Sequence, residues 1–415
     1  MRKITYTTAL AIALAASPAL ATNGIRMIGF GPVQESMGGV SVGAGLDAAT
    51  VLTNPANMAG LPGRVDFGAT YFSADVKYTA ASLAPGVIAS TGEQESDRKP
   101  GPVPAFGLVI PLNDEVRFGL GAYGVAGLGT DYPYNVADNT AYTNYAQMRF
   151  APGLSWRIND LVSVGGTVNL YYSSLGYNVG GQSFGQVTHN DSTNFGIGGT
   201  VGVRVTPMKA LSIGIAYESE GFHPTFKYNT PQFTFDPDGP GPGGPITIPA
   251  NVEELTFNSP QVLSGGIGFQ VTPALLVAAD VQWINWSGVL GDDQPEYEVS
   301  NPTSLPFDVE WEDQVVFKIG AQLAASDAFR IRLGYDYGKQ PLNEDKAIQN
   351  IAFPAIAEHH ITAGLGWNAT PKLAINLGAV YAPEVKLSGT DPNFAATYEV
   401  KMSQFSLDAG ISYVF

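Results

Sequence analysis

The feature that most constrains this chain is a strict alternation of apolar residues with small or polar ones, repeated along most of its length. In the stretch LSIGIAYES, every second residue is apolar: Leu211, Ile213, Ile215 and Tyr217. Successive side chains of a β-strand point to opposite faces, so each such run predicts a strand with one apolar face.

The composition of the opposite face favours a membrane barrel over a soluble sandwich. A sandwich buries its apolar faces and turns longer polar side chains to water. In TNFGIGGTVGVRVTP, residues 193–207, the second face is instead mostly Gly and Thr. Such a face fits the inside of a closed barrel whose apolar face meets lipid, because no sheet edge can stay unpaired there.

About fourteen runs of this kind are present, an even number as in bacterial barrels. They cover residues 65–78, 102–111, 115–127, 145–157, 161–177, 193–206, 210–222, 260–271, 275–287, 312–324, 328–338, 358–370, 372–384 and 403–415. We therefore predict an all-β fold, a transmembrane antiparallel β-barrel of about 14 strands.

The connections between the runs support this interpretation, because short and long ones alternate. Short ones hold PLND, RIND, TPMK, TPA, ASD and TPK, and long ones cover about 79–101, 128–144, 178–192, 223–259, 288–311, 339–357 and 385–402. Short periplasmic turns alternating with long outer loops are typical of the outer membrane of Gram-negative bacteria. The Gly-Pro-rich stretch 236–250 suits an exposed loop.

Both chain ends fit export to that membrane. Arg2 and Lys3 precede an apolar run at 9–16 and small residues at 19–21, which predicts a secretory signal peptide over residues 1–21. The final run alternates up to Phe415, resembling the closing strand that the outer-membrane assembly machinery reads. We expect a monomer in contact with outer-membrane lipid and lipopolysaccharide.

Composition excludes some partners and chemistries. The formal net charge of −16 argues against a nucleic-acid partner, because phosphate binding needs clustered basic residues. The chain has no cysteine, so disulfides and thiolate metal sites are excluded. The adjacent His359 and His360 would point to opposite faces of a strand and cannot share a metal. We expect no metal, no cofactor and no catalytic residues.

Residues 22–62 precede the first strand and lack its alternation. This segment is nearly uncharged, rich in Gly and Ala, and too short for a domain of its own. A barrel of about 14 strands has a lumen wider than its own side chains fill. We expect the segment to fold inside the lumen as a plug, and residues 63–415 to form the barrel.

Within this segment, a GG pair is followed by Asp-Ala-Ala at 47–49 and by Asn54-Pro55-Ala56. In this order they resemble the N-terminal hatch of the FadL/TodX family of outer-membrane transporters, and FPAIAEHHITAGLGWNATPKLAINLGAVYAPE, residues 353–384, also resembles that family. The resemblance implies passive uptake of long-chain fatty acids or other hydrophobic compounds. It also implies a hatch motif, Asn54-Pro55-Ala56, lying against a kinked third strand beside a lateral opening.

We place that kink where the third run continues into GAYGVAGLGTDYP. Glycines cluster there, at Gly121, Gly124, Gly127 and Gly129. Glycine in a strand often marks a bulge or bend. Pro55 would fix a turn, and Asn54 could bond backbone groups freed at a broken strand, although the motif could also simply begin a helical turn.

A fatty acid would need a cation for its carboxylate, because an unpaired anion in a dry tunnel is costly. The parity of the strands turns several basic residues inward, and the candidates are Lys318, Arg332, Arg149 and Arg157. Lys318 could instead pair with Asp280 on the preceding strand. Ligand capture from outside would fall to aromatic residues of the longest loop: Phe222, Phe226, Phe233 and Phe235.

Other function classes remain open at this point. A general porin for hydrophilic solutes would share the polar lumen, and a structural or adhesive surface barrel would share the fold. An enzyme would need Ser or Asp beside a His at one depth, and we can place no such pair. The choice between a fatty acid and a neutral hydrocarbon as the transported molecule also stays open.

Overall fold

The chain forms a closed β-barrel. The computed structural model describes residues 22–82, 92–136, 139–181, 188–230, 232–235, 246–292, 297–299, 309–346, 350–391 and 396–415. The barrel strands are β3 (Arg64–Ser82), β5 (Gly101–Pro111), β6 (Val116–Val136), β7 (Asn139–Arg157), β8 (Val162–Gly181), β9 (Thr188–Met208), β10 (Leu211–Glu218), β15 (Val262–Thr272), β16 (Leu275–Ile284), β18 (Gln314–Ala324), β19 (Phe329–Gly338), β20 (His359–Asn368), β21 (Leu373–Asp391) and β22 (Ala396–Val414).

Each barrel strand pairs antiparallel with its neighbours along the chain, and β22 pairs with β3 from Ala396↔Ser82 to Val414↔Arg64. This last ladder closes the sheet and leaves no edge, as a wall in lipid requires. The predicted barrel of 14 antiparallel strands is therefore confirmed, with every predicted run falling on a separate strand.

Alternation along the strands decides which side chains face outward. On β10, Ile215 is 58% exposed while Ala216 is 3% exposed. The closing strand repeats the pattern, with Leu407 exposed and Ser406 and Asp408 buried. Hydrophobic side chains thus cover the outer wall, and small or polar ones line the half of the barrel next to the short turns.

The predicted long loops are wrong in extent at three places. Strands β6 and β7 are paired as far as Val136↔Asn139, β8 reaches Gly181, and β21 and β22 are paired as far as Asp391↔Ala396. Beyond the lipid an outward face gains nothing from being apolar, so the alternation fades while backbone pairing continues. Conversely, β10 ends at Glu218, before its predicted limit.

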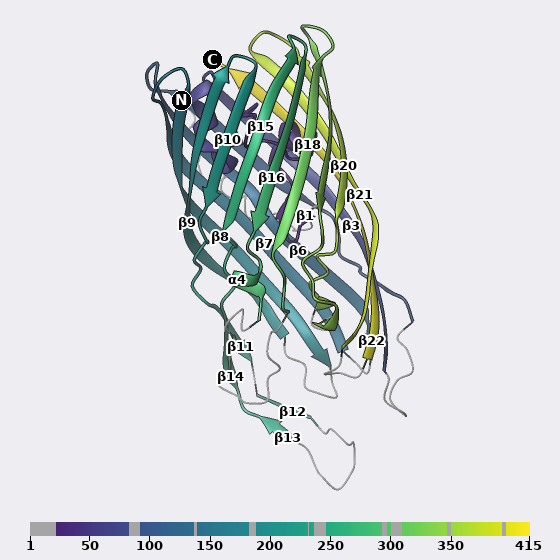
Figure 1. The fold of residues 1–415 in the computed structure, drawn as a ribbon. Coiled ribbons are helices and arrows are strands. Elements are labelled where there is room, and N and C mark those ends of the chain that lie inside the picture. The colour runs from purple at the N-terminus through teal and green to yellow at the C-terminus, as the bar shows by residue number, and fades with distance from the viewer. Residues whose placement is uncertain are drawn as a thin grey trace, which may run out of the picture.

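Residues 22–62, the N-terminal segment, lie inside the barrel (Figure 1). The segment forms β1 (Thr22–Asn23), β2 (Arg26–Met27), α2 (Gly31–Glu35), α3 (Thr50–Thr53) and η1 (Pro55–Gly60). Its short helices lie in the half nearest the short turns and the C-terminus. The predicted signal peptide, residues 1–21, lies outside the described residues.

Several short strands and helices lie at the long-loop end of the barrel. They are β4 (Gln94–Glu95), β11 (Phe226–Thr230), β12 (Phe233–Phe235), β13 (Ile246–Ile248), β14 (Asn251–Leu255), α4 (Ser287–Leu290), β17 (Tyr297–Val299) and η2 (Glu344–Lys346). Pairing of β11 with β14 and of β12 with β13 forms ribbons that extend below the barrel in Figure 1. Among the described residues, no helix is long and apolar enough to cross a bilayer.

Candidate functional site: the barrel interior

Polar contacts to ten barrel strands hold the N-terminal segment in place. The partners, strand by strand, are Asp66 of β3, Gly127 of β6, Arg149 of β7, Val203 of β9, Glu218 of β10, Asp280 of β16, Lys318 of β18, Asp336 of β19, Thr362 of β20 and Gln404 of β22. All of them except Asp66 are far from the segment in the chain, and together they surround it in space. The segment is therefore fixed from all sides of the lumen.

Asp280 makes the most concentrated of these contacts. Its Oδ2 accepts the backbone N–H of Ser41 at 2.7 Å and of Val42 at 2.9 Å, and its Oδ1 accepts that of Gly43 at 3.3 Å. Bonds to a carboxylate are stronger than neutral ones, so three of them on one side chain make a firm anchor. Asp280 and Lys318 lie opposite each other on neighbouring strands, but they do not form the ion pair that the sequence suggested. The side chain of Asp280 binds the N-terminal segment instead.

Lys318 also binds the N-terminal segment. Its Nζ donates to the Ile28 carbonyl at 2.6 Å and lies 3.9 Å from Asp336 Oδ2. Asp336 in turn accepts from Asn23 Nδ2 at 3.0 Å and contacts His360 Nδ1 at 2.8 Å. His360 is buried against this carboxylate, whereas His359 stacks on Tyr337, as expected for adjacent residues on a strand.

Two arginines share one buried carboxylate at the middle of the interior. Arg26 of the segment donates to both oxygens of Glu218, at 3.1 and 2.9 Å, and Arg149 Nη1 lies 2.7 Å from Glu218 Oε1. Arg149 also lies over the ring of Phe30, 5.4 Å from its centroid. Arg26 and Glu218 were not predicted, because 192 residues separate them and only the fold brings them together.

A small polar cavity lies between this cluster and Lys318. Arg26, Glu218, Lys318 and Gln282 are among its lining residues, and its volume is about 30 Å³. Such a volume holds on the order of two water molecules. The cavity is too small for a fatty acid or an aromatic ring without movement of the N-terminal segment.

Asn54-Pro55-Ala56 begins the short helix η1, with Asn54 as its N-cap. Asn54 Oδ1 accepts the N–H of Ala56, and Asn54 Nδ2 donates to the carbonyls of Val42 at 2.9 Å and Val203 at 3.2 Å. The motif therefore bonds to β9 and not to the third barrel strand, β6, that we expected. Nearby side chains do reach β6, since a Cβ on Gly121 would meet Leu52.

The third barrel strand is nevertheless irregular. Its ladder with β7 shifts register between Gly124 and Ala126, so Val125 forms a bulge. Its ladder with β5 ends at Ala105↔Tyr123. Beyond that point β6 pairs instead with the N-terminal segment, where the Gly127 N–H donates to the Ile25 carbonyl at 3.0 Å.

The four predicted kink glycines therefore differ in setting. Gly121 stays in regular register with both neighbours, Gly124 borders the bulge, Gly127 bonds to Ile25, and Gly129 pairs with Asn144. Only two of them contact the irregular part of the strand. Gly121 instead allows α3 to approach the wall closely.

Two prolines of β5, which our prediction from the sequence did not include, mark the end of the β5–β6 ladder in the sequence. Pro102 and Pro104 flank Val103, and this part of β5 pairs with β3 on one side only. Proline has no N–H to donate and is confined to the unpaired side of strands. The motif PVP therefore explains why the β5–β6 ladder stops where it does.

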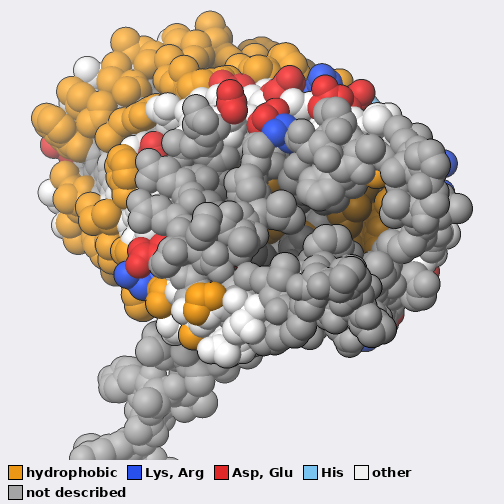
Figure 2. Space-filling view, turned by 90° about the horizontal axis from the view of Figure 1, so that it is seen from below, with side chains coloured by type: hydrophobic (Ala, Val, Ile, Leu, Met, Phe, Trp, Pro, Cys, Tyr) orange, Lys and Arg blue, Asp and Glu red, His pale blue; other side chains and the backbone are white. Residues whose placement is uncertain are grey.

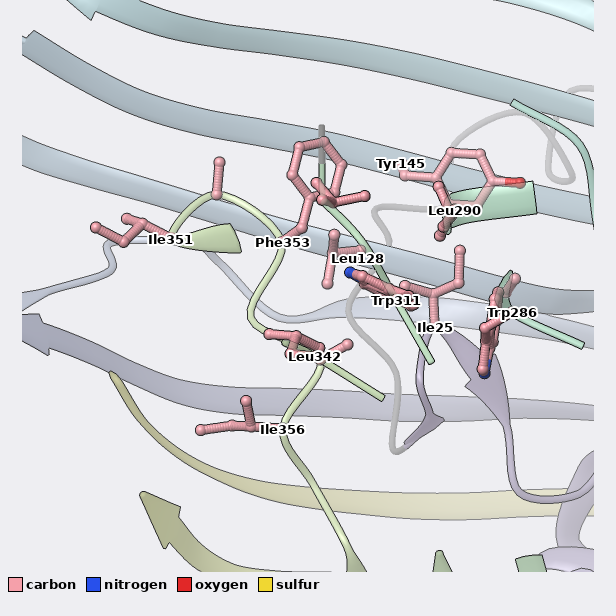
Figure 3. Packing of buried hydrophobic residues seen from close by; sticks show 14 of the residues in the cluster. Ile25, Leu128, Tyr145, Trp286, Leu290, Trp311, Leu342, Ile351, Phe353 and Ile356 are labelled. Carbon is pink, nitrogen blue, oxygen red and sulfur yellow. The ribbon is translucent and has the colours of Figure 1, made fainter. Parts of the chain in front are cut away.

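A cluster of buried hydrophobic side chains lies in the half of the interior next to the long loops, and Figure 3 shows some of its members. This outer apolar cluster comprises Ile25, Val76, Tyr78, Ala126, Leu128, Tyr132, Tyr145, Leu175, Phe226, Tyr228, Leu255, Phe257, Val262, Ile284, Trp286, Val289, Leu290, Val309, Trp311, Val316, Leu342, Ile351, Ala352, Phe353, Ala355, Ile356, Ala357, Ala382, Leu387, Tyr398, Val400 and Met402. Every member is uncharged. Seen from the long-loop end, hydrophobic atoms are visible within the mouth, and acidic ones line part of the rim (Figure 2).

Two tryptophans show how the cluster stays apolar. The rings of Trp286 and Trp311 meet edge to face, with centroids 5.2 Å apart. The Trp311 Nε1–H donates to Asn350 Oδ1 and that of Trp286 to Gln314 Oε1. Since each indole N–H has a partner, the ring faces offer only apolar surface.

The outer apolar cluster reaches the irregular part of β6. Ile25, Ala126 and Leu128 belong to the cluster, and Ile25 bonds to Gly127 beside the bulge. Val103 and Val125 are buried on the other side of this contact, 5% and 3% exposed. Hydrophobic side chains of two separate buried clusters therefore lie beside the point where β5 and β6 stop pairing.

The structure does not bring the four candidate carboxylate contacts together. Arg149 pairs with Glu218 and Lys318 with the N-terminal segment. Arg332 donates to Gln322 Oε1 and Asn376 Oδ1, and Arg157 donates to the Asp114 carbonyl at a short turn. None of the four belongs to the outer apolar cluster.

The four predicted capture phenylalanines do not form one surface either. Phe222 is 59% exposed beside Ile197 on the outer wall, whereas Phe226 is fully buried in the outer apolar cluster. Phe233 and Phe235 lie on β12, and their side chains lie outside the described part of the chain. Phe222 and Phe226 therefore lie in different surroundings although only three residues separate them in the sequence.

Two carboxyl groups of the N-terminal segment lie in dry surroundings. Burial, together with the Asp66 carboxylate, raises the pKa of Asp47 to about 7. Burial, together with the Asp408 carboxylate, holds the pKa of Glu35 well above its usual range. Both groups therefore favour the protonated form when the segment is docked.

Residues 10–415 match the family described as outer membrane protein transport protein (OMPP1/FadL/TodX). The chain belongs to this family. Its members are transport proteins and not enzymes, and this protein is accordingly an outer-membrane barrel of a Gram-negative bacterium. A search of curated proteins found no match.

Solved structures of similar fold include two toluene transporters and a FadL homologue. The toluene transporter TodX of Pseudomonas putida has a TM-score of 0.73 and 18% identity, over 94% of this chain and 99% of that one. The toluene transporter TbuX of Ralstonia pickettii has a TM-score of 0.71 and 19% identity, over 94% and 99%. A FadL homologue of Pseudomonas aeruginosa has a TM-score of 0.73 and 16% identity, over 94% and 100%. At these identities the likeness shows the fold.

Proposed function

We propose that this protein is a passive channel for neutral hydrophobic molecules, which leave sideways between β5 and β6 into the membrane. The observation that carries the proposal is that the outer apolar cluster and a second buried hydrophobic cluster, which includes Val103 and Val125, both reach the end of the β5–β6 ladder. A hydrophobic molecule that moves along these side chains passes from one apolar environment inside the barrel to another in the membrane. No energy source is needed, because burial of apolar surface is favourable at both ends.

The placement of the charges supports a neutral substrate over a fatty acid. A carboxylate drawn from water to the hydrophobic side chains of the outer apolar cluster would lose its hydration. The candidate cations lie outside the cluster and already have partners within the protein. Two proteins of similar fold are toluene transporters, which agrees with an aromatic hydrocarbon as the transported molecule.

In this proposal, the N-terminal segment over residues 22–62 acts as the hatch and residues 63–415 as the barrel. The hatch fills the polar half of the lumen and leaves a cavity of about 30 Å³ beside Arg26 and Lys318. A general porin needs an open aqueous path, which this arrangement opposes. Recognition of the closing strand by the assembly machinery, contact with lipopolysaccharide and a monomeric state remain predictions from the sequence.

A disulfide across the proposed exit tests the route. A Cβ on Gly124 would lie 3.7 Å from the Cβ of Val103, within the range that disulfides span. The natural chain has no cysteine, so Val103→Cys with Gly124→Cys forms one defined bridge between β5 and β6. Uptake of radiolabelled toluene and oleate would be measured in an outer-membrane-bearing host lacking its own fatty-acid transporter.

We expect the oxidised double variant to lose toluene uptake at least tenfold and to regain it when reductant is added. Val103→Cys alone, at equal surface expression, is the matched control and should transport as the wild type does. Gly124→Cys alone does not serve as a control, because its Cβ would overlap Val103 Cγ1. Wild-type uptake by the oxidised double variant would refute the lateral route. Oleate uptake as fast as that of toluene would refute the neutral substrate class.

A further inference from the structure

The outer wall of the barrel carries an apolar hollow in the lipid-facing surface of strands β6 to β10. Its volume is about 660 Å³, and the outward side chains around it include Val116, Leu154, Trp156, Val201 and Ile215. Trp156 is 49% exposed and Val201 is 59% exposed. The wall of a barrel is convex, so a hollow of this size needs a local cause.

Glycines on both faces of the wall supply that cause. A Cβ on inward-facing Gly165 would lie 2.5 Å from the Pro55 carbonyl carbon, and one on Gly202 would overlap Asn54 Oδ1. The wall therefore rests directly on the hatch motif with only backbone between the motif and the lipid. Gly166, between these positions on the outward face, adds no side chain to fill the surface.

The hollow lies near the short turns and thus toward the periplasmic leaflet. Val116 is the first residue of β6, and Trp156 is the last residue but one of β7. The Trp156 indole donates to Glu115 Oε2 at the turn, at 3.4 Å. Tryptophan anchored in this way is typical of the boundary between hydrocarbon and head groups.

Charged side chains of both signs lie on short turns that flank the strands of the hollow. Glu115 and Asp160 are exposed on two of the short turns, and Lys209 is exposed on a third. This combination complements a lipid head group that carries both a phosphate and a cation. Pockets of about 300–1,000 Å³ commonly hold one lipophilic molecule, and an apolar lining suits an acyl chain.

We propose that this hollow binds an acyl chain of one glycerophospholipid from the periplasmic leaflet, with the head group at the short turns. The site is separate from the transport path and does not depend on the proposed function. Lipopolysaccharide is not its ligand, because its acyl chains occupy the other leaflet. The wall of the hollow is also the surface that Asn54 and Pro55 contact from inside.

Native mass spectrometry of protein extracted from outer membranes in mild detergent tests this assignment. Gly166→Leu fills the hollow without overlap, since its Cβ would meet only Thr200 O at 3.6 Å and Val201 Cγ1 at 3.9 Å. Gly265→Leu is the matched control, because Gly265 of β15 also faces outward and its Cβ would meet only Val281 Cγ1 at 4.0 Å. Val201→Trp fills the hollow from another strand and serves if Gly166→Leu does not fold.

We expect the wild type and Gly265→Leu to retain one phospholipid, and Gly166→Leu and Val201→Trp to retain at least tenfold less. Folding of each variant is checked by the shift in electrophoretic mobility between heated and unheated samples. Equal retention by the filled variants would overturn the proposal. A wild type that carries no lipid, or one that carries lipopolysaccharide instead, would overturn it as well.

Discussion

The anchor formed by Asp280 gives the sharpest test of how the N-terminal segment is held. Asp280→Asn keeps the size of the side chain but removes its charge and one acceptor oxygen. The neutral amide can still accept from two of the three N–H groups that the carboxylate binds at 2.7, 2.9 and 3.3 Å. Its NH₂ group must then face the third N–H, and two donors cannot bond to each other.

The expected loss follows from typical hydrogen-bond energies. A bond to a charged group contributes about 1.5–3 kcal/mol net and a neutral one about 0.5–1.5 kcal/mol. Three contacts that each lose roughly 1 kcal/mol weaken docking of residues 41–43 by about 3 kcal/mol. Because each 1.4 kcal/mol is tenfold, local opening of the segment should become roughly 100-fold more frequent.

Hydrogen–deuterium exchange of peptides covering residues 36–44 measures this opening directly. Exchange in Asp280→Asn should be roughly 100-fold faster than in the wild type, while exchange in the barrel strands stays unchanged. Asp75→Asn is the control, because Asp75 is half exposed, pairs only with Lys77 and does not contact the segment. Exchange within about threefold of the wild type would refute the role given to Asp280.

Three further predictions concern the same interior. The raised pKa of Asp47 means that the docked segment binds the proton more tightly than the free one, so docking should weaken as pH rises from about 4 to about 7 and then level off. Asp47→Asn should reduce this dependence in deuterium exchange corrected for intrinsic rates, and the part due to Glu35, whose pKa is also raised, should remain. Gly214→Val should dislodge the segment and raise ion conductance in planar bilayers, because its Cβ would overlap the Val42 carbonyl, whereas the outward Gly265→Val should not. Glu218→Gln leaves two buried arginines without their shared counter-charge and should cost roughly 3–5 kcal/mol in urea unfolding from lipid vesicles, with exposed Glu399→Gln near zero.

The barrel was predictable from sequence because lipid imposes a rule on every strand. An outward residue such as Phe195 or Ile215 must be apolar, and its neighbours inside need only be small. The resulting period of two located each strand and the parity of its turns. The rule ends where the lipid ends. The alternation therefore predicts loops where the long-loop ends of β6, β7, β21 and β22 are in fact paired.

The candidate site was less predictable, because its contacts join residues that are distant in sequence. Asp280 and Ser41 are separated by 239 residues, and no local pattern links a strand carboxylate with the amides of a glycine-rich segment. Pro102 and Pro104 are the exception. Their missing N–H groups mark the unpaired side of β5 in the sequence itself, and they indicate the end of the ladder better than the glycines of β6 do.

The distribution of the anchors also decides what kind of opening the proposed route needs. Expelling the whole segment would break contacts to ten strands, including the three bonds of Asp280 and the pair between Arg26 and Glu218. Moving only the part beside the β6 bulge breaks the bond between Gly127 and Ile25, worth about 1 kcal/mol net for a neutral backbone pair. Passage of a small neutral molecule is therefore compatible with a local shift near Ile25 while Asn54, Asp280 and the rest of the segment stay docked.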